Sequence, residues 1–290
     1  MTAVATAARP VIVVGAGTMG SGIAHVFAQH GWDTLLVDTV PGALERARQT
    51  IAANLDRQVK KGALTAEQKA AALDRLVTAP ALDGKLGGPE LVIEAATEQR
   101  ETKFAIFREL DRAAPPEAIL ATNTSSISIT AIAAQTSRPG LVIGMHFMNP
   151  VPVMPLVEII RGLETTDATT GRTVAIAQAL GKTPVEVRDA PGFVSNRVLM
   201  PMINEAIFCV MEGVATPDAV DTVMKLGMNH PLGPLALADL IGLDVCLAIL
   251  EVLHRDLGDD KYRPCPLLRT MVAAGRLGRK SGRGFFDYGR

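Results

Sequence analysis

Two side chains in the middle of the sequence have types and spacing that suit acid–base chemistry. His146 ends the apolar run LVIGMHF, and Glu158 lies twelve residues later in the run PLVEII. An imidazole titrates near neutral pH, so it can take a proton from a hydroxyl group and return it. A carboxylate bonded to the other ring nitrogen would fix the tautomer and stabilise the imidazolium. The spacing therefore suggests a His146–Glu158 pair, with a structural histidine as the alternative.

Glycines near the start of the chain form a second pattern with chemical meaning. The motif G-x-G-x-x-G follows the apolar run PVIVV and consists of Gly15, Ala16, Gly17, Thr18, Met19 and Gly20. Its first glycine permits a tight turn, its second lets the backbone approach a pyrophosphate, and its third allows the helix to pack closely on the sheet. Asp38 ends the next apolar run, where a carboxylate binds the adenosine ribose and repels a 2′-phosphate. We expect a site that prefers NAD to NADP, and a solvated loop acid is the alternative for Asp38.

Polar residues follow two further apolar runs. Glu94 and Glu98 come after one run, and the segment NTSS at Asn123–Ser126 comes after another. In doubly wound folds the ligand lies beyond the carboxyl ends of the strands, so we expect these polar groups to face the cofactor. Ser125 could also be the N-cap of the helix predicted for ISITAIAAQ.

The hydrophobic pattern indicates the elements that must position these residues. Residues 10–38 run as an apolar strand, a glycine turn, a helix closed by Gly31 and a second apolar strand, which is a βαβ unit. Strands without polar alternation are typical of a parallel sheet covered by helices. Further strands are predicted at Leu76–Ala79, Leu91–Ala95, Ala118–Thr122, Leu141–His146, Pro155–Ile160 and Thr183–Val187.

The strand signal ends at about residue 188, and the rest of the chain reads as helices. A helical insertion at about residues 40–75, broken near Gly62, follows the second strand. We predict an α/β fold with two domains. A Rossmann-like doubly wound sheet domain spans residues 1–188, an all-helical C-terminal domain spans residues 189–290, and the hinge lies near Gly192.

Composition narrows the class of protein. The 290 residues are 48% hydrophobic and 20% charged, which is typical of a globular protein. The net charge of −1 provides no overall field for nucleic acid or an anionic membrane. The three cysteines, an odd number without close pairing, argue against a disulfide framework or a cysteine-rich metal site. With no signal sequence and no apolar run of membrane-spanning length, we expect a cytoplasmic protein that binds neither nucleic acid nor membrane.

Five motifs spread over nearly the whole chain resemble one enzyme family. In order, they are GAGTMGSGIA, NTSSISIT, HFMNPVPVMPLVEII, DAPGFVSNRVL and GRKSGRGFFDY. Together they look like L-3-hydroxyacyl-CoA dehydrogenase, and especially its short bacterial 3-hydroxybutyryl-CoA dehydrogenase forms. The glycine motif is shared by many unrelated enzymes, whereas HFMNPVPVMPLVE and PGFVSNR are specific to this family and its close relatives. Met148 replaces the second phenylalanine of the usual HFFNP, a swap between apolar side chains.

The resemblance implies a catalytic role for four matching residues. His146 would be the base and Glu158 its orienting partner, while Ser125 and Asn196 would hydrogen-bond the 3-oxygen and the acyl carbonyl of the substrate. The substrate would then lie between the two domains. Judged without the resemblance, Asn196 could equally be a helix cap.

The resemblance also implies which residues contact NAD. It assigns to the cofactor side Glu98, Lys103, Ser125, Asn149 and Lys280. Spacing alone predicts that Lys103 and Lys280 are solvated charges.

The helical insertion carries a cluster of cations that could meet the phosphates of CoA. Arg57, Lys60 and Lys61 lie within one and a half helical turns, next to Asn54. A solvated helix face is the alternative. The resemblance implies CoA binding at Asn54 and Lys61, and the residues themselves add Lys60 and Arg57 as weaker candidates.

Together these features predict a reversible, NAD-linked and metal-free interconversion of an (S)-3-hydroxyacyl-CoA, foremost 3-hydroxybutyryl-CoA, with a 3-oxoacyl-CoA. Two alternatives remain: a dehydrogenase of free hydroxy acids or sugar acids on the same fold, and an NAD-binding structural or sensing protein. The apolar helices at Val198–Val214 and Ala238–Leu253 have more apolar residues than one buried stripe needs, so we also expect a homodimer.

Overall fold

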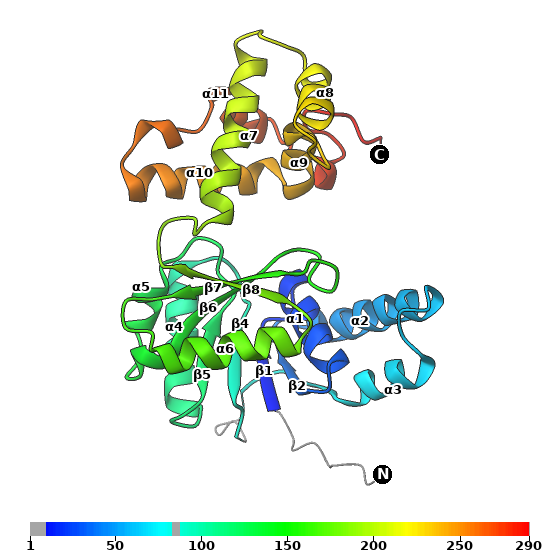
Figure 1. Cartoon of the computed structure of the whole chain (residues 1–290), viewed down its shortest axis with the longest axis vertical. Helices are drawn as coiled ribbons and strands as arrows, with labels where there is room; N and C mark the ends of the chain where they lie inside the picture. The colour runs from blue at the N-terminus through cyan, green and yellow to red at the C-terminus, as the bar shows by residue number, and fades with distance from the viewer. Residues whose placement is uncertain (1–9, 83–87, 290) are drawn as a thin grey trace. The chain divides into compact units, whose positions relative to one another are not determined.

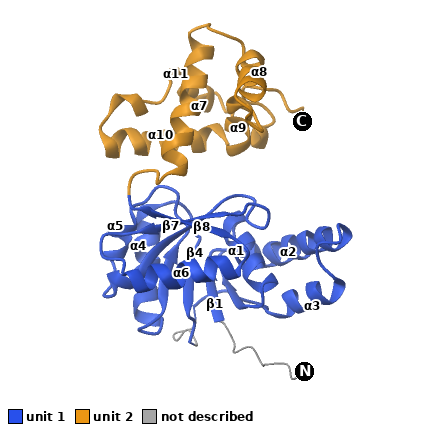
Figure 2. Ribbon diagram, viewed as in Figure 1, with its two compact units in different colours: residues 1–189 blue, residues 190–290 orange. Residues whose placement is uncertain are grey.

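The computed structural model describes residues 10–82 and 88–289, and the chain divides into two compact units. Unit 1 comprises Met1–Asp189 and unit 2 comprises Ala190–Arg290 (Figure 2). Unit 1 contains the sheet, and unit 2 consists of helices and turns in its described residues (Figure 1). The predicted fold class, a doubly wound sheet domain followed by a helical domain, is therefore confirmed.

The sheet has eight strands in the order β3-β2-β1-β4-β5-β6-β7-β8. The strands are β1 (Pro10–Val14), β2 (Asp33–Val37), β3 (Leu76–Ala79), β4 (Leu91–Glu94), β5 (Ile119–Thr122), β6 (Val142–Phe147), β7 (Leu156–Arg161) and β8 (Thr183–Arg188). Each predicted strand is present within a residue or so of its expected bounds. The pattern is readable because the central strands are apolar along their whole length and buried on both faces.

The sheet is not parallel throughout. Strands β1 to β6 pair in parallel, β7 pairs antiparallel with β6, and β8 pairs parallel with β7. The connection between β6 and β7 is the short loop 148–155. A parallel crossover needs a dozen or more residues, so a connection of this length reverses the chain. This reversal was not predicted from the apolar pattern, which does not specify strand direction.

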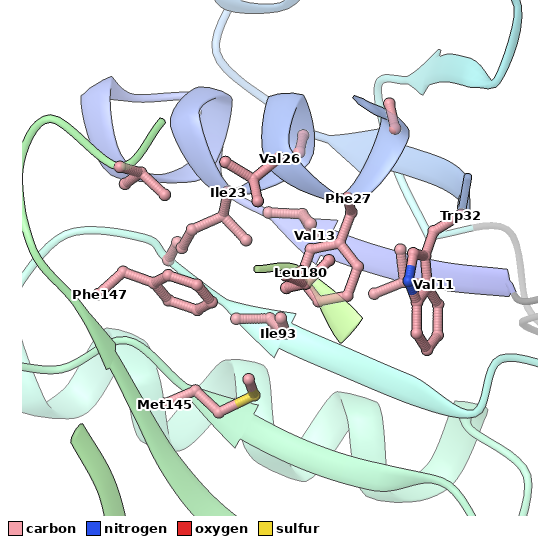
Figure 3. Packing of buried hydrophobic residues seen from close by; sticks show 14 of the residues in the cluster. Val11, Val13, Ile23, Val26, Phe27, Trp32, Ile93, Met145, Phe147 and Leu180 are labelled. Atoms are coloured by element: carbon pink, nitrogen blue, oxygen red, sulfur yellow. The ribbon is translucent and has the colours of Figure 1, made fainter. Parts of the chain in front are cut away.

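Helices cover both faces of the sheet. On one face, α1 (Thr18–Gln29) and α6 (Asp167–Ala179) share a core with residues from β1, β4 and β6. Figure 3 shows Ile23 and Phe27 of α1 directed toward the sheet, near Ile93 and Phe147. The alternate strand residues are buried too, where α4 (Arg100–Ala113) and α5 (Ile129–Ala133) contact β4, β5 and β6. A short 3-10 turn, Pro139–Leu141, leads into β6.

The predicted helical insertion is present as α2 (Ala43–Lys60) and α3 (Ala66–Asp74). Figure 1 shows both helices beside α1, and α2 buries an i, i+4 stripe formed by Ala43, Ala47, Ile51 and Leu55. The break between the helices lies at Gly62, whose φ of 71° is in the left-handed region. The outer face of α2 is therefore left to polar and charged side chains.

Unit 2 has its own apolar core. Its helices are α7 (Ser195–Met211), α8 (Pro217–Gly227), α9 (Pro234–Ile241), α10 (Leu243–Leu257) and α11 (Pro266–Ala273), with 3-10 turns at Asp260–Tyr262 and Arg279–Ser281. The core includes Ile203, Leu250 and Leu268, and Phe285 and Phe286 from the C-terminal segment pack against it. Among the residues described, no helix combines the length and apolarity needed to cross a membrane.

Candidate active site

The register between β6 and β7 brings the acid–base pair together. His146 lies directly opposite Glu158 in the antiparallel ladder, so the two side chains point to the same face. The imidazole Nδ1 is 2.8 Å from Glu158 Oε2, and both side chains are buried. Because a carboxylate accepts, Nδ1 carries the proton, which leaves Nε2 with its lone pair.

Ser125 lies on the other side of the imidazole. It follows β5, and its Oγ is 3.2 Å from His146 Nε2. The neighbouring strands β5, β6 and β7 therefore place Ser125, His146 and Glu158 in one hydrogen-bonded row. The N-cap alternative for Ser125 is wrong, because the N-cap of α5 is Ser128, whose Oγ accepts from the Ala131 N–H.

Two further residues fix this corner of the sheet: Asn123, from the segment expected to face the cofactor, and Lys182, which was not singled out from the sequence. Asn123 Oδ1 accepts from the Phe147 N–H at 2.9 Å and so ties the end of β5 to the end of β6. Lys182 Nζ donates to the carbonyls of Val151 at 2.6 Å and Met154 at 2.8 Å, which fixes the loop between β6 and β7. Asn123 belongs to the polar NTSS segment, whereas Lys182 had no signal in the sequence.

The glycine loop has the shape that a bound dinucleotide requires. Gly15 has a φ of 104°, and a Cβ there would lie 2.6 Å from the Ala95 carbonyl oxygen. A Cβ on Gly20 would lie 1.8 Å from the Gly15 carbonyl oxygen. A Cβ on Gly17 would meet nothing within 4 Å. The protein itself thus needs glycine at positions 15 and 20, while the open side at Gly17 fits the approach of a pyrophosphate to the start of α1.

Asp38 is bound to this loop. Its Oδ2 accepts from the Ala16 N–H at 2.6 Å, and its Oδ1 accepts from the Val40 N–H at 2.7 Å. The carboxylate is half-buried and fixed beside the glycine turn, so it is not a freely solvated loop acid. Each oxygen keeps a second lone pair that a ribose hydroxyl could use. Thr18, at the start of α1, is exposed, whereas Met19 packs against the core.

Glu98 and Lys103 meet below the Ser125 loop. Glu98 Oε2 is 3.5 Å from Lys103 Nζ, and Lys103 is only 1% exposed. The prediction of a solvated charge at Lys103 is therefore wrong. Glu94, expected to face the cofactor, is instead fully enclosed and bound to the same ammonium at 2.7 Å. The prediction for Lys103 failed because a lysine is usually solvated. Its spacing with Phe107 and Leu110, four and seven residues later, nevertheless places it on the buried stripe of α4.

Burial of Glu98 by itself would raise the pKa of its carboxyl. The Lys103 ammonium and the hydrogen bonds from Thr124, Ser125 and Ser126 outweigh burial and hold this pKa below its ordinary value. Glu98 is therefore ionised at neutral pH.

The remaining residues assigned by resemblance lie apart in the chain. Asn149 is exposed in the loop after β6. Asn196 is buried as the second residue of α7, and because the N-cap is Val194, the alternative of an N-terminal cap at Asn196 is wrong. Lys280 is exposed, as expected for a solvated charge, and its Nζ also lies 2.5 Å from Asp244 Oδ1 in an ion pair within unit 2.

The cation cluster of the insertion lies at the end of α2. Lys60 is the last residue of the helix, Lys61 is its C-cap, and both are exposed. Arg57 donates to the amide oxygen of Asn54 one turn earlier. The four side chains therefore share one end of one helix, as their spacing predicts.

The histidine of α1 has a structural environment. His25 is fully buried, its Nε2 lies 2.9 Å from Gln29 Oε1, and burial lowers the pKa of its imidazole to about 4. It is therefore neutral at physiological pH. Among the described residues, no three His, Cys, Asp or Glu side chains gather as metal ligands would.

Comparison with known proteins places this geometry in a family. Residues 10–190 match the model of the 3-hydroxyacyl-CoA dehydrogenase NAD-binding domain, and residues 192–288 match that of the C-terminal domain. The chain is 56% identical over 280 residues to a probable 3-hydroxybutyryl-CoA dehydrogenase of Bacillus subtilis, covering 97% of each chain. It is 54% identical over 280 residues to the 3-hydroxybutyryl-CoA dehydrogenase of Bradyrhizobium diazoefficiens, covering 97% of this chain and 95% of that one.

A solved structure agrees with these matches. The crystal structure of (S)-3-hydroxybutyryl-CoA dehydrogenase from Ralstonia eutropha gives a TM-score of 0.94 at 51% identity, covering 98% of this chain and all of that one. The chain therefore belongs to the 3-hydroxyacyl-CoA dehydrogenase family, and its glycine-loop unit is the NAD-binding domain of that family.

Proposed function

We propose that this chain interconverts (S)-3-hydroxybutyryl-CoA and acetoacetyl-CoA with NAD, using His146 and Glu158 as its proton-transfer pair. The observation that carries the proposal is the row Ser125 Oγ, His146 Nε2, His146 Nδ1 and Glu158 Oε2, with successive contacts of 3.2 and 2.8 Å. This row lies at the carboxyl end of β5 and β6 in a unit that binds NAD. The names of relatives that are 54–56% identical support the choice of acyl-CoA.

In the oxidative direction His146 Nε2 takes the proton of the 3-hydroxyl group. The imidazolium formed is stabilised by the Glu158 carboxylate, which already accepts from Nδ1. Ser125 and Asn196 hydrogen-bond the 3-oxygen and the acyl carbonyl, so that the carbon–oxygen bond is polarised as the ketone forms. NAD, when bound, would accept the hydride that leaves C3. In the reductive direction His146 returns the proton.

The proposal also assigns residues to the binding of NAD and CoA. Gly15, Gly17 and Gly20 shape the loop for the pyrophosphate, and Asp38 binds the adenosine ribose. Thr18, Met19, Glu98, Asn149 and Lys280 complete the cofactor side in this proposal. Lys103, assigned to the same side by resemblance, would act there by supporting Glu98, whose Oε2 lies 3.5 Å from its ammonium. Asn54, Lys60 and Lys61 at the end of α2 would hold the CoA phosphates.

A substrate panel tests the proposal. NADH oxidation is followed with acetoacetyl-CoA, with longer and carboxylated 3-oxoacyl-CoA thioesters, and with free acetoacetate. We expect a far higher kcat/KM for acetoacetyl-CoA than for free acetoacetate. Comparable values for the two would favour a dehydrogenase of free acids. Normal NADH binding without turnover of any thioester would favour a structural or sensing role.

We also propose that unit 2 forms a homodimer. Its surface carries exposed apolar side chains on α7 and α8, including Val198, Val223 and Leu226, with Leu226 82% exposed. By contrast, the apolar residues of α10 lie mainly in the core of the unit, so α8 is a better candidate than the predicted segment Ala238–Leu253. Exposed apolar area of this kind is typical of an interface. Light scattering at micromolar concentration should give twice the monomer mass, and a monomer would contradict the proposal.

A further inference from the structure

A buried ion pair lies beneath the loop that carries Ser125. Lys103 Nζ is 2.7 Å from Glu94 Oε1 and 2.9 Å from Glu94 Oε2. Glu94 is at the end of β4 and Lys103 is in the first turn of α4, and the two side chains are 0% and 1% exposed. Glu94 also accepts from the Thr122 hydroxyl at 2.7 Å and from the Ala96 N–H at 2.7 Å. The carboxylate is thus fixed from β5, from α4 and from its own strand end.

The same ammonium reaches a second carboxylate. Glu98 Oε2 lies 3.5 Å from Lys103 Nζ. The other oxygen, Glu98 Oε1, accepts from the N–H groups of Ser125 and Ser126, each at 2.9 Å. It also accepts from the hydroxyls of Thr124 at 2.6 Å and Ser126 at 3.0 Å. One carboxylate oxygen therefore gathers the donors of three consecutive residues.

These contacts form an unbroken path from the ion pair to the imidazole. Glu94 holds Lys103, Lys103 holds Glu98, and Glu98 holds the backbone of Ser125, whose Oγ contacts His146. We propose that Glu94 and Lys103 are positioning residues that act on the reaction only through Glu98, by keeping Ser125 in reach of both His146 and the substrate oxygen. The proposal rests on the substrate role given to Ser125 above.

Stability alone does not account for ions at this position. A buried ion pair commonly contributes no more than apolar residues of similar volume would, because both ions lose their hydration. What the ions provide here is a cation under Glu98, which keeps that carboxylate charged while it accepts four hydrogen bonds. The burial of Lys103 also argues against direct contact with NAD, because its ammonium already faces three carboxylate oxygens.

The same unit contains a comparable clamp that carries no site residue. Asp111 accepts from the Ser137 N–H at 2.8 Å, from the Ser137 hydroxyl at 3.2 Å and from Arg138 Nε at 2.8 Å. Here too a carboxylate holds a loop and a cation supports the carboxylate. Arg138→Met is therefore a matched control for Lys103→Met, because it removes a cation from a carboxylate clamp elsewhere in unit 1.

The first measurement is the pH profile of Lys103→Met with acetoacetyl-CoA and NADH. Without the ammonium, the buried Glu94 and the partly exposed Glu98 are left with no cation between them, so their mutual repulsion raises the pKa of Glu98. In the native enzyme this pKa is depressed, and the clamp is lost only when the pH falls through that low value. In the variant the clamp is lost at a higher pH. We expect kcat/KM to fall about 10- to 100-fold near pH 7, to recover partly as the pH rises, and NADH affinity to change less than about threefold.

Controls separate this result from general destabilisation. Arg138→Met should lower the melting temperature without moving the acid limb of the profile. Glu94→Gln keeps an acceptor for Lys103 and leaves the ammonium to Glu98, so it should lower kcat/KM less than Lys103→Met and leave the acid limb unshifted. Ser125→Ala tests the proposed function separately, because full activity of that variant would remove the substrate role of Ser125 whatever Lys103 does.

Several outcomes would overturn the proposal. A folded Lys103→Met with the native profile would show that Glu98 needs no cation, and an equal loss of NADH affinity and kcat/KM would show direct contact with the cofactor. If Lys103→Met does not fold, Glu94→Gln decides. Asp111→Asn, the corresponding change in the Asp111 clamp, is its control. If Glu94→Gln loses more kcat/KM than Asp111→Asn and keeps its NADH affinity, the proposal is supported. Native kinetics of Glu94→Gln at every pH would overturn it.

Discussion

The candidate active site has two parts that depend on different features of the chain. One is the glycine loop after β1, and the other is the side-chain row across β5, β6 and β7. The loop works through backbone shape, because a Cβ at Gly15 or Gly20 would overlap main-chain atoms. The row works through functional groups, and it depends on the register that sets His146 opposite Glu158. A site made from backbone shape is encoded in six adjacent residues. A site made from side chains depends on the register between neighbouring strands, whose residues are not adjacent in the sequence.

The clearest break between the two parts is expected from His146→Ala. This change removes the base but leaves the glycine loop intact. We expect kcat to fall about 10²–10⁴-fold, the usual range for general acid–base catalysis, with NADH affinity nearly unchanged. Stopped-flow turnover and NADH fluorescence titration measure the two quantities separately. Near-normal turnover would remove His146 from the mechanism.

A smaller loss is expected from Glu158→Gln. The amide can still accept from Nδ1, so the ring keeps its place, but it offers no charge to the imidazolium. We expect kcat to fall about 10²-fold, at the lower end of the acid–base range, with the melting temperature close to native. If activity falls only together with thermal stability, the carboxylate has a structural role and the pair is not a catalytic dyad.

The difference between the two parts also explains what could be predicted from sequence. The glycine loop, Asp38 and the strands were predictable because their signals are local: motif spacing and unbroken apolar runs. The direction of β7 was overlooked, although the eight residues between the predicted strands Leu141–His146 and Pro155–Ile160 are too few for a parallel crossover. The register that sets His146 opposite Glu158 was not predictable, because it depends on how the loop 148–155 packs, and Lys182, just before β8, fixes that loop. The sequence therefore indicated His146 and Glu158 as candidates but could not show that they face each other.

The inward turn of Lys103 was missed for the same reason. Its partner Glu94 is nine residues away on another element, so the ion pair has no local signal, although the spacing of Lys103 with Phe107 and Leu110 places it on the buried stripe of α4. Ser125 and Ser128 illustrate the point at shorter range. Either serine could begin α5 by its type; in the structure Ser128 does, and the Ser125 N–H donates to Glu98 instead. Side-chain pairs across elements are settled by packing, which a local pattern does not contain.

The glycine loop itself offers a contrast between two substitutions. In Gly20→Ala the new Cβ would lie 1.8 Å from a main-chain oxygen, so we expect a loss of more than about 3 kcal/mol in unfolding free energy. In Gly17→Ala the new Cβ meets no protein atom, so stability should stay within about 1 kcal/mol. NADH affinity of Gly17→Ala should nevertheless fall about tenfold, equivalent to about 1.4 kcal/mol, because the methyl group occupies the approach of the pyrophosphate. Denaturant melts and titration of both variants check this, and native NADH affinity in Gly17→Ala would place the pyrophosphate elsewhere.

Asp38→Ala tests the carboxylate that follows β2 and accepts a hydrogen bond from the glycine loop. The change removes a ribose acceptor and the repulsion of a 2′-phosphate, so the ratio of kcat/KM for NADH over NADPH should narrow by about tenfold, the effect of one or two hydrogen bonds. The Ala16 and Val40 N–H groups also lose their acceptor, so a melting curve must accompany the kinetics. A native enzyme that prefers NADPH would contradict the role of Asp38 directly.

The smallest effect is expected at the end of α2. This surface belongs neither to the glycine loop nor to the side-chain row. Lys60 and Lys61 are exposed cations on a helix end, and they would meet CoA phosphates far from the reacting carbon. Because such a contact is equal in ground and transition states, Lys61→Ala should raise KM for acetoacetyl-CoA about two- to fivefold, as for exposed ion pairs, and leave kcat nearly unchanged. The effect should shrink as salt rises, since the Debye length is about 10 Å at 0.1 M.

Lys69→Ala is a matched control on α3, because this lysine is ion-paired to Asp56 at 2.5 Å and has no proposed contact with CoA. If the Lys60→Ala/Lys61→Ala double variant keeps the native KM at low salt, these lysines do not hold CoA, and the exposed end of α2 is simply a solvated surface.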